Sequence, residues 1–138
     1  MNNFEQYTPT KVIFGKGSEE KAGEAVKNAG GSKVLLVYGG GSAVKSGLIE
    51  RVEKSLTEAG VGYIEFGGAK PNPTLAHAED GVVIAKTENI DFILAVGGGS
   101  AIDTAKAIAH GTANPDNALW DLWTKKVPLT KSLPVGAI

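Results

Sequence analysis

Short, continuous apolar runs alternate along the chain with longer segments of mixed character. Residues 33–38 (KVLLVY) and 92–96 (FILAV) are too short for helices and rich in strand-forming residues, which is typical of strands buried on both faces. Residues 61–66 (VGYIEF) alternate more, which indicates a strand nearer the edge of a sheet. Two shorter runs, 11–14 (KVIF) and 133–138 (LPVGAI), predict a first strand and the beginning of a last one.

The segments between these runs carry apolar residues at helical spacing. A helix is expected over residues 18–28, where a serine and two glutamates suit the N-terminus, and a second helix over residues 42–59. For a third helix, over residues 73–89, Asn72 is expected to be the N-cap and Pro73 the first helical residue.

A fourth helix is expected after the strand at 92–96, with Ser100 as its cap and an end near His110. Strands and helices therefore alternate in the order β-α-β-α-β-α-β-α. This order predicts an α/β fold, a Rossmann-like parallel sheet with helices on both faces, as one domain over residues 1–138.

Two of the predicted strands end in the same four residues, Gly-Gly-Gly-Ser. The two bends consist of Gly39, Gly40, Gly41, Ser42 and Gly97, Gly98, Gly99, Ser100. Right-handed crossovers bring both bends to the carboxyl edge of a parallel sheet, where α/β proteins bind ligands. Because N–H groups at glycine turns and helix N-termini attract anions, the bends predict a seat for the pyrophosphate of a dinucleotide. The alternative is a purely structural turn, since Ile102 takes the last glycine position of G-x-G-x-x-G.

The first bend also bears on which dinucleotide binds. An acidic residue that holds the adenosine ribose hydroxyls often follows the second strand of such folds, and no acid stands at this bend. Backbone N–H groups, the Ser42 hydroxyl and Lys45 could instead receive a 2′-phosphate, which favours NADP(H) over NAD(H). The alternative is a flexible turn without a phosphate contact.

Composition and charge exclude several classes of protein. The 138 residues contain no cysteine, so disulfides and thiolate chemistry are excluded. With a net charge of −1 and no basic block, nothing indicates a nucleic-acid partner, and no apolar run approaches membrane-spanning length. The polar N-terminus lacks a signal core, so a cytoplasmic protein is expected. His77, expected to face solvent, and His110, expected at a helix end where a cation is favoured, lack ligand-like spacing, so no metal site is expected.

Four segments in order, TPTKVIFGKG, YGGGSAVKSG, PNPTLAHAEDGVVIAK and GGGSAIDTAKAIA, resemble the iron-containing (group III) alcohol dehydrogenases. The similarity is strongest to the NADP-linked butanol dehydrogenase branch. It implies an oxidoreductase that transfers hydride between NADP(H) and a primary alcohol or aldehyde. In that family an iron or zinc ion is bound by one aspartate and three histidines of a C-terminal helical domain. The sequence stops before such a domain, so we expect an N-terminal cofactor domain that has no catalytic residue or metal ligand and is inactive alone.

The resemblance also assigns roles to individual residues. It places the second glycine bend on the cofactor pyrophosphate, Asp103 near the nicotinamide ribose and Asn72 near the adenosine part of the cofactor. Each assignment has a simpler alternative, because Asp103 also suits the helix dipole and Asn72 also suits a cap. Trp120 and Trp123 are expected to be packing or interface residues.

The resemblance implies a homodimer through the N-terminal strand, around residues 10–14. Two other functions stay open at this stage. One is a stand-alone nucleotide-binding module, and the other is a self-associating module without catalysis.

Overall fold

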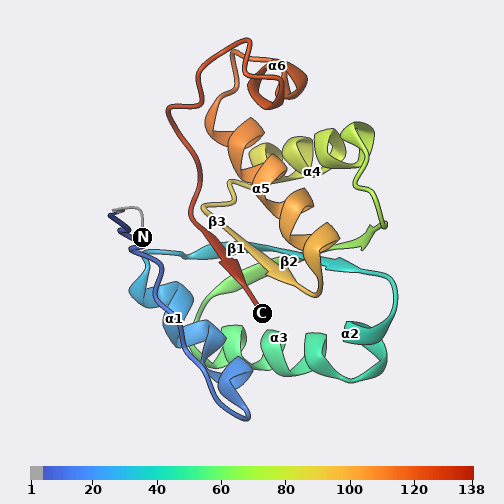
Figure 1. The fold of residues 1–138 in the computed structure, drawn as a ribbon. Helices are drawn as coiled ribbons and strands as arrows, with labels where there is room; N and C mark the ends of the chain where they lie inside the picture. The colour runs from blue at the N-terminus through green and yellow to red at the C-terminus, as the bar shows by residue number, and fades with distance from the viewer. Residues whose placement is uncertain (1–4) are drawn as a thin grey trace, which may run out of the picture.

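The structure is a computed structural model that describes residues 5–138. One sheet of four strands lies at its centre, in the order β2-β1-β3-β4, and every neighbouring pair is parallel (Figure 1). The strands are β1 (Lys33–Gly39), β2 (Gly62–Ala69), β3 (Phe92–Val96) and β4 (Val135–Ala137). The predicted parallel α/β sheet is confirmed, and β2 lies at the edge as its alternating sequence indicates.

Helices cover both faces of the sheet, as predicted. They are η1 (a 3-10 turn, Ser18–Lys21), α1 (Ala22–Asn28), α2 (Ser42–Lys45), α3 (Leu48–Glu58), α4 (Leu75–Thr87), α5 (Gly99–Ala113) and α6 (Leu119–Trp123). Figure 1 shows α1, α2 and α3 on one face and α4 and α5 on the other. Within residues 5–138, no helix has the length and apolar character needed to cross a membrane.

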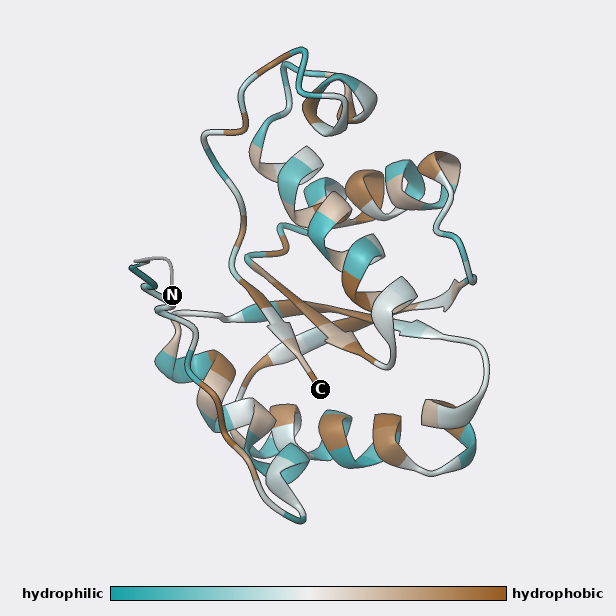
Figure 2. Ribbon diagram, in the orientation of Figure 1, coloured by the Kyte–Doolittle hydropathy of each residue, from teal (hydrophilic) through white to brown (hydrophobic). Residues whose placement is uncertain are grey.

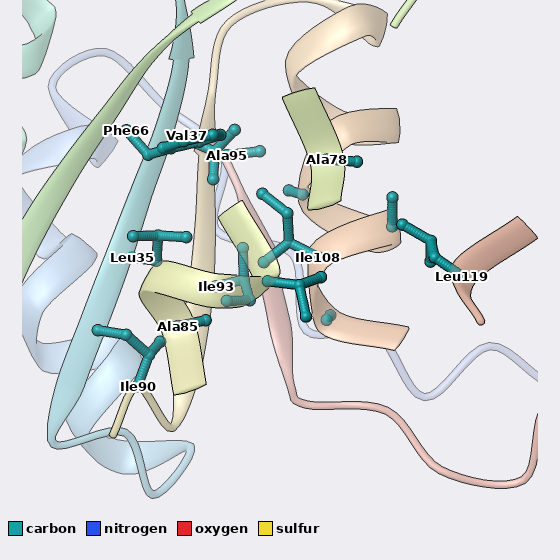
Figure 3. Close-up of a cluster of buried hydrophobic side chains, with 14 residues drawn as sticks. Leu35, Val37, Phe66, Ala78, Ala85, Ile90, Ile93, Ala95, Ile108 and Leu119 are labelled. Atoms are coloured by element: carbon teal, nitrogen blue, oxygen red, sulfur yellow. The ribbon is translucent and has the colours of Figure 1, made fainter. Parts of the chain in front are cut away.

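Alternate residues of the central strands feed two separate cores, because successive side chains of a strand point to opposite faces. Leu35 and Ile93 belong to the cluster under α4 and α5, where Ile108 is also fully buried (Figure 3). Leu36 and Leu94 belong to the cluster under α1 and α3. The strands are accordingly the most continuously apolar part of the ribbon (Figure 2). Both faces of the central strands β1 and β3 are thus buried, as the unbroken apolar runs predicted.

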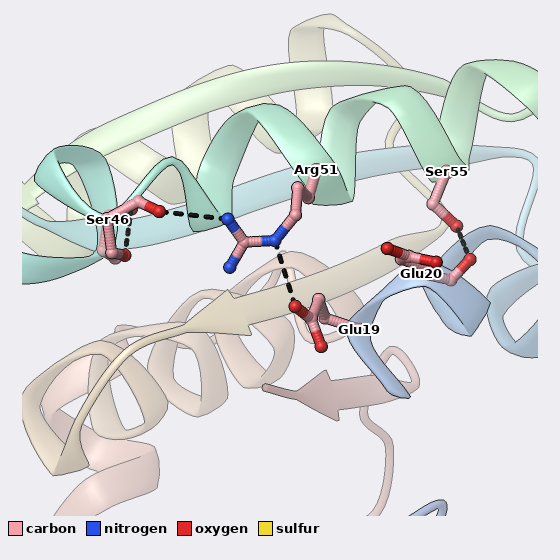
Figure 4. Close-up of polar contacts among 6 residues, drawn as sticks. Glu19, Glu20, Ser46, Arg51 and Ser55 are labelled. Carbon is pink, nitrogen blue, oxygen red and sulfur yellow. Dashed lines mark hydrogen bonds and ion pairs between the residues drawn. The ribbon is translucent and has the colours of Figure 1, made fainter. Parts of the chain in front are cut away.

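Polar contacts attach η1 and α1 to α3, and Figure 4 shows those of Glu19 and Glu20 in η1. The Nε atom of Arg51 donates to a carboxylate oxygen of Glu19 at 3.0 Å, and Nη1 of the same arginine donates to the Ser46 carbonyl at 3.0 Å. The Ser55 hydroxyl donates to the Glu20 carbonyl at 2.6 Å and accepts the Gly23 amide at 2.9 Å. These bonds tie the first helical turns to the middle of a helix more than 30 residues later.

The Asp91 side chain forms hydrogen bonds at the end of the sheet where β1 and β3 begin. Its carboxylate accepts the Ser32 and Lys33 amides, each at 2.9 Å, and the Ser32 hydroxyl. Burial alone would raise the pKa of Asp91, but these hydrogen bonds outweigh it and hold the pKa below its usual range. The ionised side chain thereby connects the N-terminal ends of β1 and β3.

We expect Asp91→Ala to lower the free energy of unfolding at pH 7 by roughly 1–3 kcal/mol, because two amides and a hydroxyl lose an ionised acceptor. A carboxylate whose pKa is lower in the folded state stabilises the fold above its unfolded pKa, about 3.9. The difference from the wild type should therefore shrink as the pH falls below about 4. Urea denaturation at pH 7 and at acidic pH measures it. The exposed Asp116, replaced by alanine, is the control, and an equal loss there would contradict the assignment.

The prediction of a strand at residues 11–14 is wrong for this chain. Residues 5–14 form no helix or strand, and the side chain of Phe14 is 99% exposed. A run of four residues needs a partner strand, and this one pairs with neither edge of the sheet. The strand at 33–38 is therefore the first of the sheet, not the second.

Both predicted helix caps are also wrong. Asn72 adopts a left-handed conformation (φ 59°), and Thr74 caps α4 instead, its hydroxyl accepting the His77 amide at 3.4 Å. Pro73 consequently lies outside the helix. At α5 the N-cap is Gly98, without a side-chain hydrogen bond, and Ser100 lies inside the helix.

The helix predicted over 42–59 is broken into α2 and α3. Gly47 between them has φ 70° and precedes the first residue of α3. A single stripe of apolar residues continues across this break, so the pattern alone does not reveal it. At the other end of the sequence, the beginning of a strand is confirmed as β4.

Candidate cofactor site

The two glycine bends lie side by side at one edge of the sheet. β1 and β3 are parallel neighbours, with Tyr38 opposite Val96, so the residues that follow both strands emerge together. The bends form a cleft of about 330 Å³ that is open to solvent. Its lining residues are Gly39, Gly40, Gly41, Ser42, Ala43, Ala69, Pro71, Val96, Gly97, Gly98, Gly99, Ser100 and Ala101. The predicted meeting of the two bends at a shared edge is confirmed.

The backbone amides of the second bend are available to a ligand. The Gly97 amide is used internally, since it donates to the Ile138 carbonyl at 2.9 Å. Within residues 5–138, the amides of Gly98, Gly99 and Ser100 have no backbone or side-chain acceptor. Gly98 is the N-cap of α5, a helix of 15 residues that begins with Gly99 and Ser100 and whose N-terminus carries a positive partial charge. The same part of the fold therefore supplies both free donors and a favourable potential for an anion.

The glycines of the bends leave space for a ligand to approach. A β-carbon placed on Gly40, Gly41, Gly98 or Gly99 would meet no atom within 4 Å, and none of the four has a positive φ. Only Gly97, with φ 136°, needs glycine for its backbone conformation. The backbone conformation of Gly98 and Gly99 would therefore also accept other residues. Because the other glycines have no side chain, their backbone is exposed where a phosphate could contact it. The cleft therefore fits the pyrophosphate of a dinucleotide.

The cleft contains eight of the ten residues predicted for the cofactor. The other two, Asn72 and Asp103, are exposed and do not line it. Asn72 follows Pro71 of the lining, and Asp103 lies in the first turns of α5. Lys45 is also outside the lining, at the exposed end of α2. The cofactor contacts of all three residues stay predictions.

Sequence reasoning missed the third wall of the cleft, which Ala69 and Pro71 form at the end of β2. The available signal was that β2 is parallel to β1, so its last residues reach the same edge. Among residues 5–138, no charged side chain lines the cleft, and its potential derives from backbone N–H groups and helix ends.

The two histidines differ from their predicted settings. The His77 ring is half-buried and stacks on Phe66, with centroids 4.5 Å apart, and its buried Nε2 has no partner among residues 5–138. It lines a separate cavity of about 140 Å³ with Lys70 and Asp80. Burial, assisted by the charge of Lys106, lowers the pKa of His110, so the expectation of a favoured cation there is wrong. In residues 5–138, no three His, Cys, Asp or Glu side chains are grouped to hold a metal ion.

The helix-covered parallel sheet, with a cleft at its carboxyl edge, defines the chain as a Rossmann-like α/β protein. The chain belongs to the iron-containing alcohol dehydrogenase family, because the family model described as "Iron-containing alcohol dehydrogenase" matches residues 9–138.

Comparison with individual proteins agrees with this assignment. Over 138 residues the chain is 49% identical to the probable NADH-dependent butanol dehydrogenase 1 of Bacillus subtilis (strain 168), covering 100% of this chain and 35% of that relative. It is 36% identical to the NADPH-dependent aldehyde reductase YqhD of Escherichia coli (strain K12), again covering 100% of this chain and 35% of the relative. The crystal structure of NADH-dependent butanol dehydrogenase A from Thermotoga maritima superposes with a TM-score of 0.94 at 43% identity, covering 99% of this chain and 34% of that one. The chain thus spans about a third of the length of these proteins.

Proposed function

We propose that residues 1–138 are the dinucleotide-binding domain of an alcohol dehydrogenase. The observation that carries this proposal is the set of free amides at Gly98, Gly99 and Ser100, facing a cleft in which the glycines leave the backbone bare. The pyrophosphate would accept these N–H groups at the N-terminus of α5. The first bend, which includes Ser42, would hold the adenosine side of the cofactor.

The reaction of the whole protein would be hydride transfer between the dinucleotide and a primary alcohol or aldehyde. When bound, the dinucleotide supplies or accepts the hydride. The residues of this chain bind and orient it, and Asp103 would lie near the nicotinamide ribose. The described residues do not fit a metal ion, so we assign them no metal ligand. We therefore expect residues 1–138 alone to have no alcohol dehydrogenase activity with added iron or zinc.

We propose NADP(H) as the preferred cofactor, and the corrected strand count gives a new reason for it. Since β1 is the first strand of the sheet, the position of a ribose-binding acid is the end of β2. That end, residues 66–70 (FGGAK), contains a lysine and no acid. Free N–H groups and the Ser42 hydroxyl would then donate hydrogen bonds to a 2′-phosphate.

Fluorescence titration of the protein with NADPH and NADH tests the site and its preference together. We expect NADPH to bind more tightly, roughly tenfold or more, from at least one additional charge-assisted hydrogen bond. Ser42→Ala should weaken NADPH binding more than NADH binding. Tighter binding of NADH would overturn the preference, in line with the printed name of the Bacillus subtilis relative, and no binding of either would overturn the site.

Self-association is a second candidate function, favoured by the apolar side chains that the N-terminal segment exposes. Tyr7, Val12 and Phe14 are 86%, 79% and 99% exposed. Burying them in a second copy would remove apolar area from water. We therefore propose a homodimer through residues 10–14. Size-exclusion chromatography of the protein and of a Val12→Lys/Phe14→Lys variant tests it, and a monomeric wild type would exclude it.

A further inference from the structure

The β2 strand contains one extra residue where it reaches the cofactor cleft. Val37 of β1 lies opposite Phe66, but Gly39 lies opposite Ala69, so two steps along β1 match three along β2. The bulge includes Gly68, which has φ 85°. It turns the strand so that Ala69, the residue directly after the bulge, enters the lining of the cleft. The bulge therefore builds the third wall.

The side chain of Tyr38 holds this bulge from the neighbouring strand. Its ring packs on Gly67, where a β-carbon would come within 2.9 Å of the ring atom Cε2. Its hydroxyl donates to a carboxylate oxygen of Glu65, two residues before Gly67, where the bulge begins. Tyr38 is also the residue immediately before Gly39. A single side chain thus links the first glycine bend to the segment that forms the opposite wall.

Neighbouring groups keep the hydrogen bond from the Tyr38 hydroxyl to Glu65 intact at neutral pH. The bond to Glu65, burial and the charges of Glu65 and Glu53 raise the pKa of Tyr38 to about 12, so its hydroxyl remains a donor. Glu53 of α3 faces the same carboxylate. Burial raises the pKa of Glu53, and the closeness of Glu65 and the charge of Glu50 add to this, while the buried Oε1 of Glu53 has no hydrogen-bond partner within residues 5–138.

We propose that Tyr38 is a positioning residue for the cofactor, acting through Glu65 and Gly67 on the wall formed by Ala69 and Pro71. This inference rests on the proposed function. The wall is apolar and adjoins the bend assigned to the adenosine side, so it suits contact with the adenine ring. Tyr38 touches none of the cofactor itself; it fixes the distance between the wall and the first bend.

The test separates the adenosine contact from the pyrophosphate seat. We expect Tyr38→Phe, which keeps the ring and removes the hydroxyl, to raise the Kd for NADPH roughly two- to tenfold, the effect of one hydrogen bond. The affinity for inorganic pyrophosphate, measured by competition, should stay unchanged, because the amides of α5 are untouched. Glu65→Ala should behave like Tyr38→Phe, whereas Glu65→Gln retains an acceptor oxygen and should restore tight NADPH binding.

Tyr63→Phe is the matched control. Tyr63 lies at the far end of β2, the strand of Glu65, opposite Val34, and removing its hydroxyl should leave both affinities unchanged. Equal NADPH affinity for the wild type and Tyr38→Phe would overturn the inference, as would a parallel loss of NADPH and pyrophosphate affinity. A wild type that binds neither ligand would overturn the proposed function, and the inference with it.

Discussion

Gly98→Val is expected to weaken dinucleotide binding roughly 10- to 150-fold, because it should remove one charge-assisted hydrogen bond worth about 1.5–3 kcal/mol. Gly98 has φ −80° and ψ −171°, an extended conformation that valine adopts readily. Its β-carbon would meet no protein atom within 4 Å, so the fold accepts the side chain. The valine methyl groups would occupy the space through which a phosphate reaches the amides of the bend.

Stability should hardly change in the same variant. Replacing a glycine N-cap by an apolar residue costs about 1 kcal/mol or less. The matched variant is Gly97→Ala, one residue earlier, where φ is 136° and the amide already donates to the Ile138 carbonyl. There we expect a loss of roughly 1–3 kcal/mol of unfolding free energy from backbone strain. NADPH titration and urea denaturation of both variants measure this contrast between binding and stability. Undiminished NADPH affinity in Gly98→Val would show that the pyrophosphate does not bind at this bend.

The central sheet and the meeting of the two bends follow from local sequence and general geometry. An apolar run such as residues 92–96 has few structures open to it other than a strand with both faces covered. Once such strands alternate with helices, right-handed crossovers fix which edge their bends share. The meeting of the two glycine bends in the cleft was therefore predictable without knowledge of any contact between distant residues.

The features that sequence did not reveal depend on pairings between distant residues or on close local competition. The bulge at Gly67 and Gly68 exists only because β2 pairs with β1, some 30 residues earlier. Asn72, Thr74 and their neighbours were all candidates for the N-cap of α4, and the backbone angles make Thr74 the N-cap. Residues 11–14 carry strand-forming side chains but pair with neither edge of the sheet. In each case the local pattern was compatible with more than one outcome.

Gly23→Ala should be the most destabilising small substitution in the α1–α3 contact. A β-carbon at this position would lie 2.1 Å from the Ser55 carbonyl oxygen and 2.8 Å from the β-carbon of Ala59. The obstructing oxygen belongs to the backbone of α3, so no side-chain rotation can relieve the overlap. α1 must therefore move away from α3, which lengthens the 2.9 Å bond from the Gly23 amide to the Ser55 hydroxyl.

The expected loss is roughly 2–6 kcal/mol, combining overpacking of about 1–3 kcal/mol with a buried amide whose hydrogen bond is broken, about 1–3 kcal/mol. Such a loss is a large part of the 5–15 kcal/mol that typically separates folded from unfolded domains. Urea denaturation followed by circular dichroism measures it. Gly62→Ala is the control, because its β-carbon would lie 3.7 Å or more from any neighbour and should change stability by less than about 0.5 kcal/mol. Ser55→Ala leaves the helix spacing intact and measures the hydrogen bonds without the overlap, since it removes the hydroxyl that accepts the Gly23 amide and donates to the Glu20 carbonyl. If Gly23→Ala unfolds at the same urea concentration as Gly62→Ala, α1 does not pack against α3 at the distance described, and the contacts of Figure 4 cannot anchor the N-terminal helix.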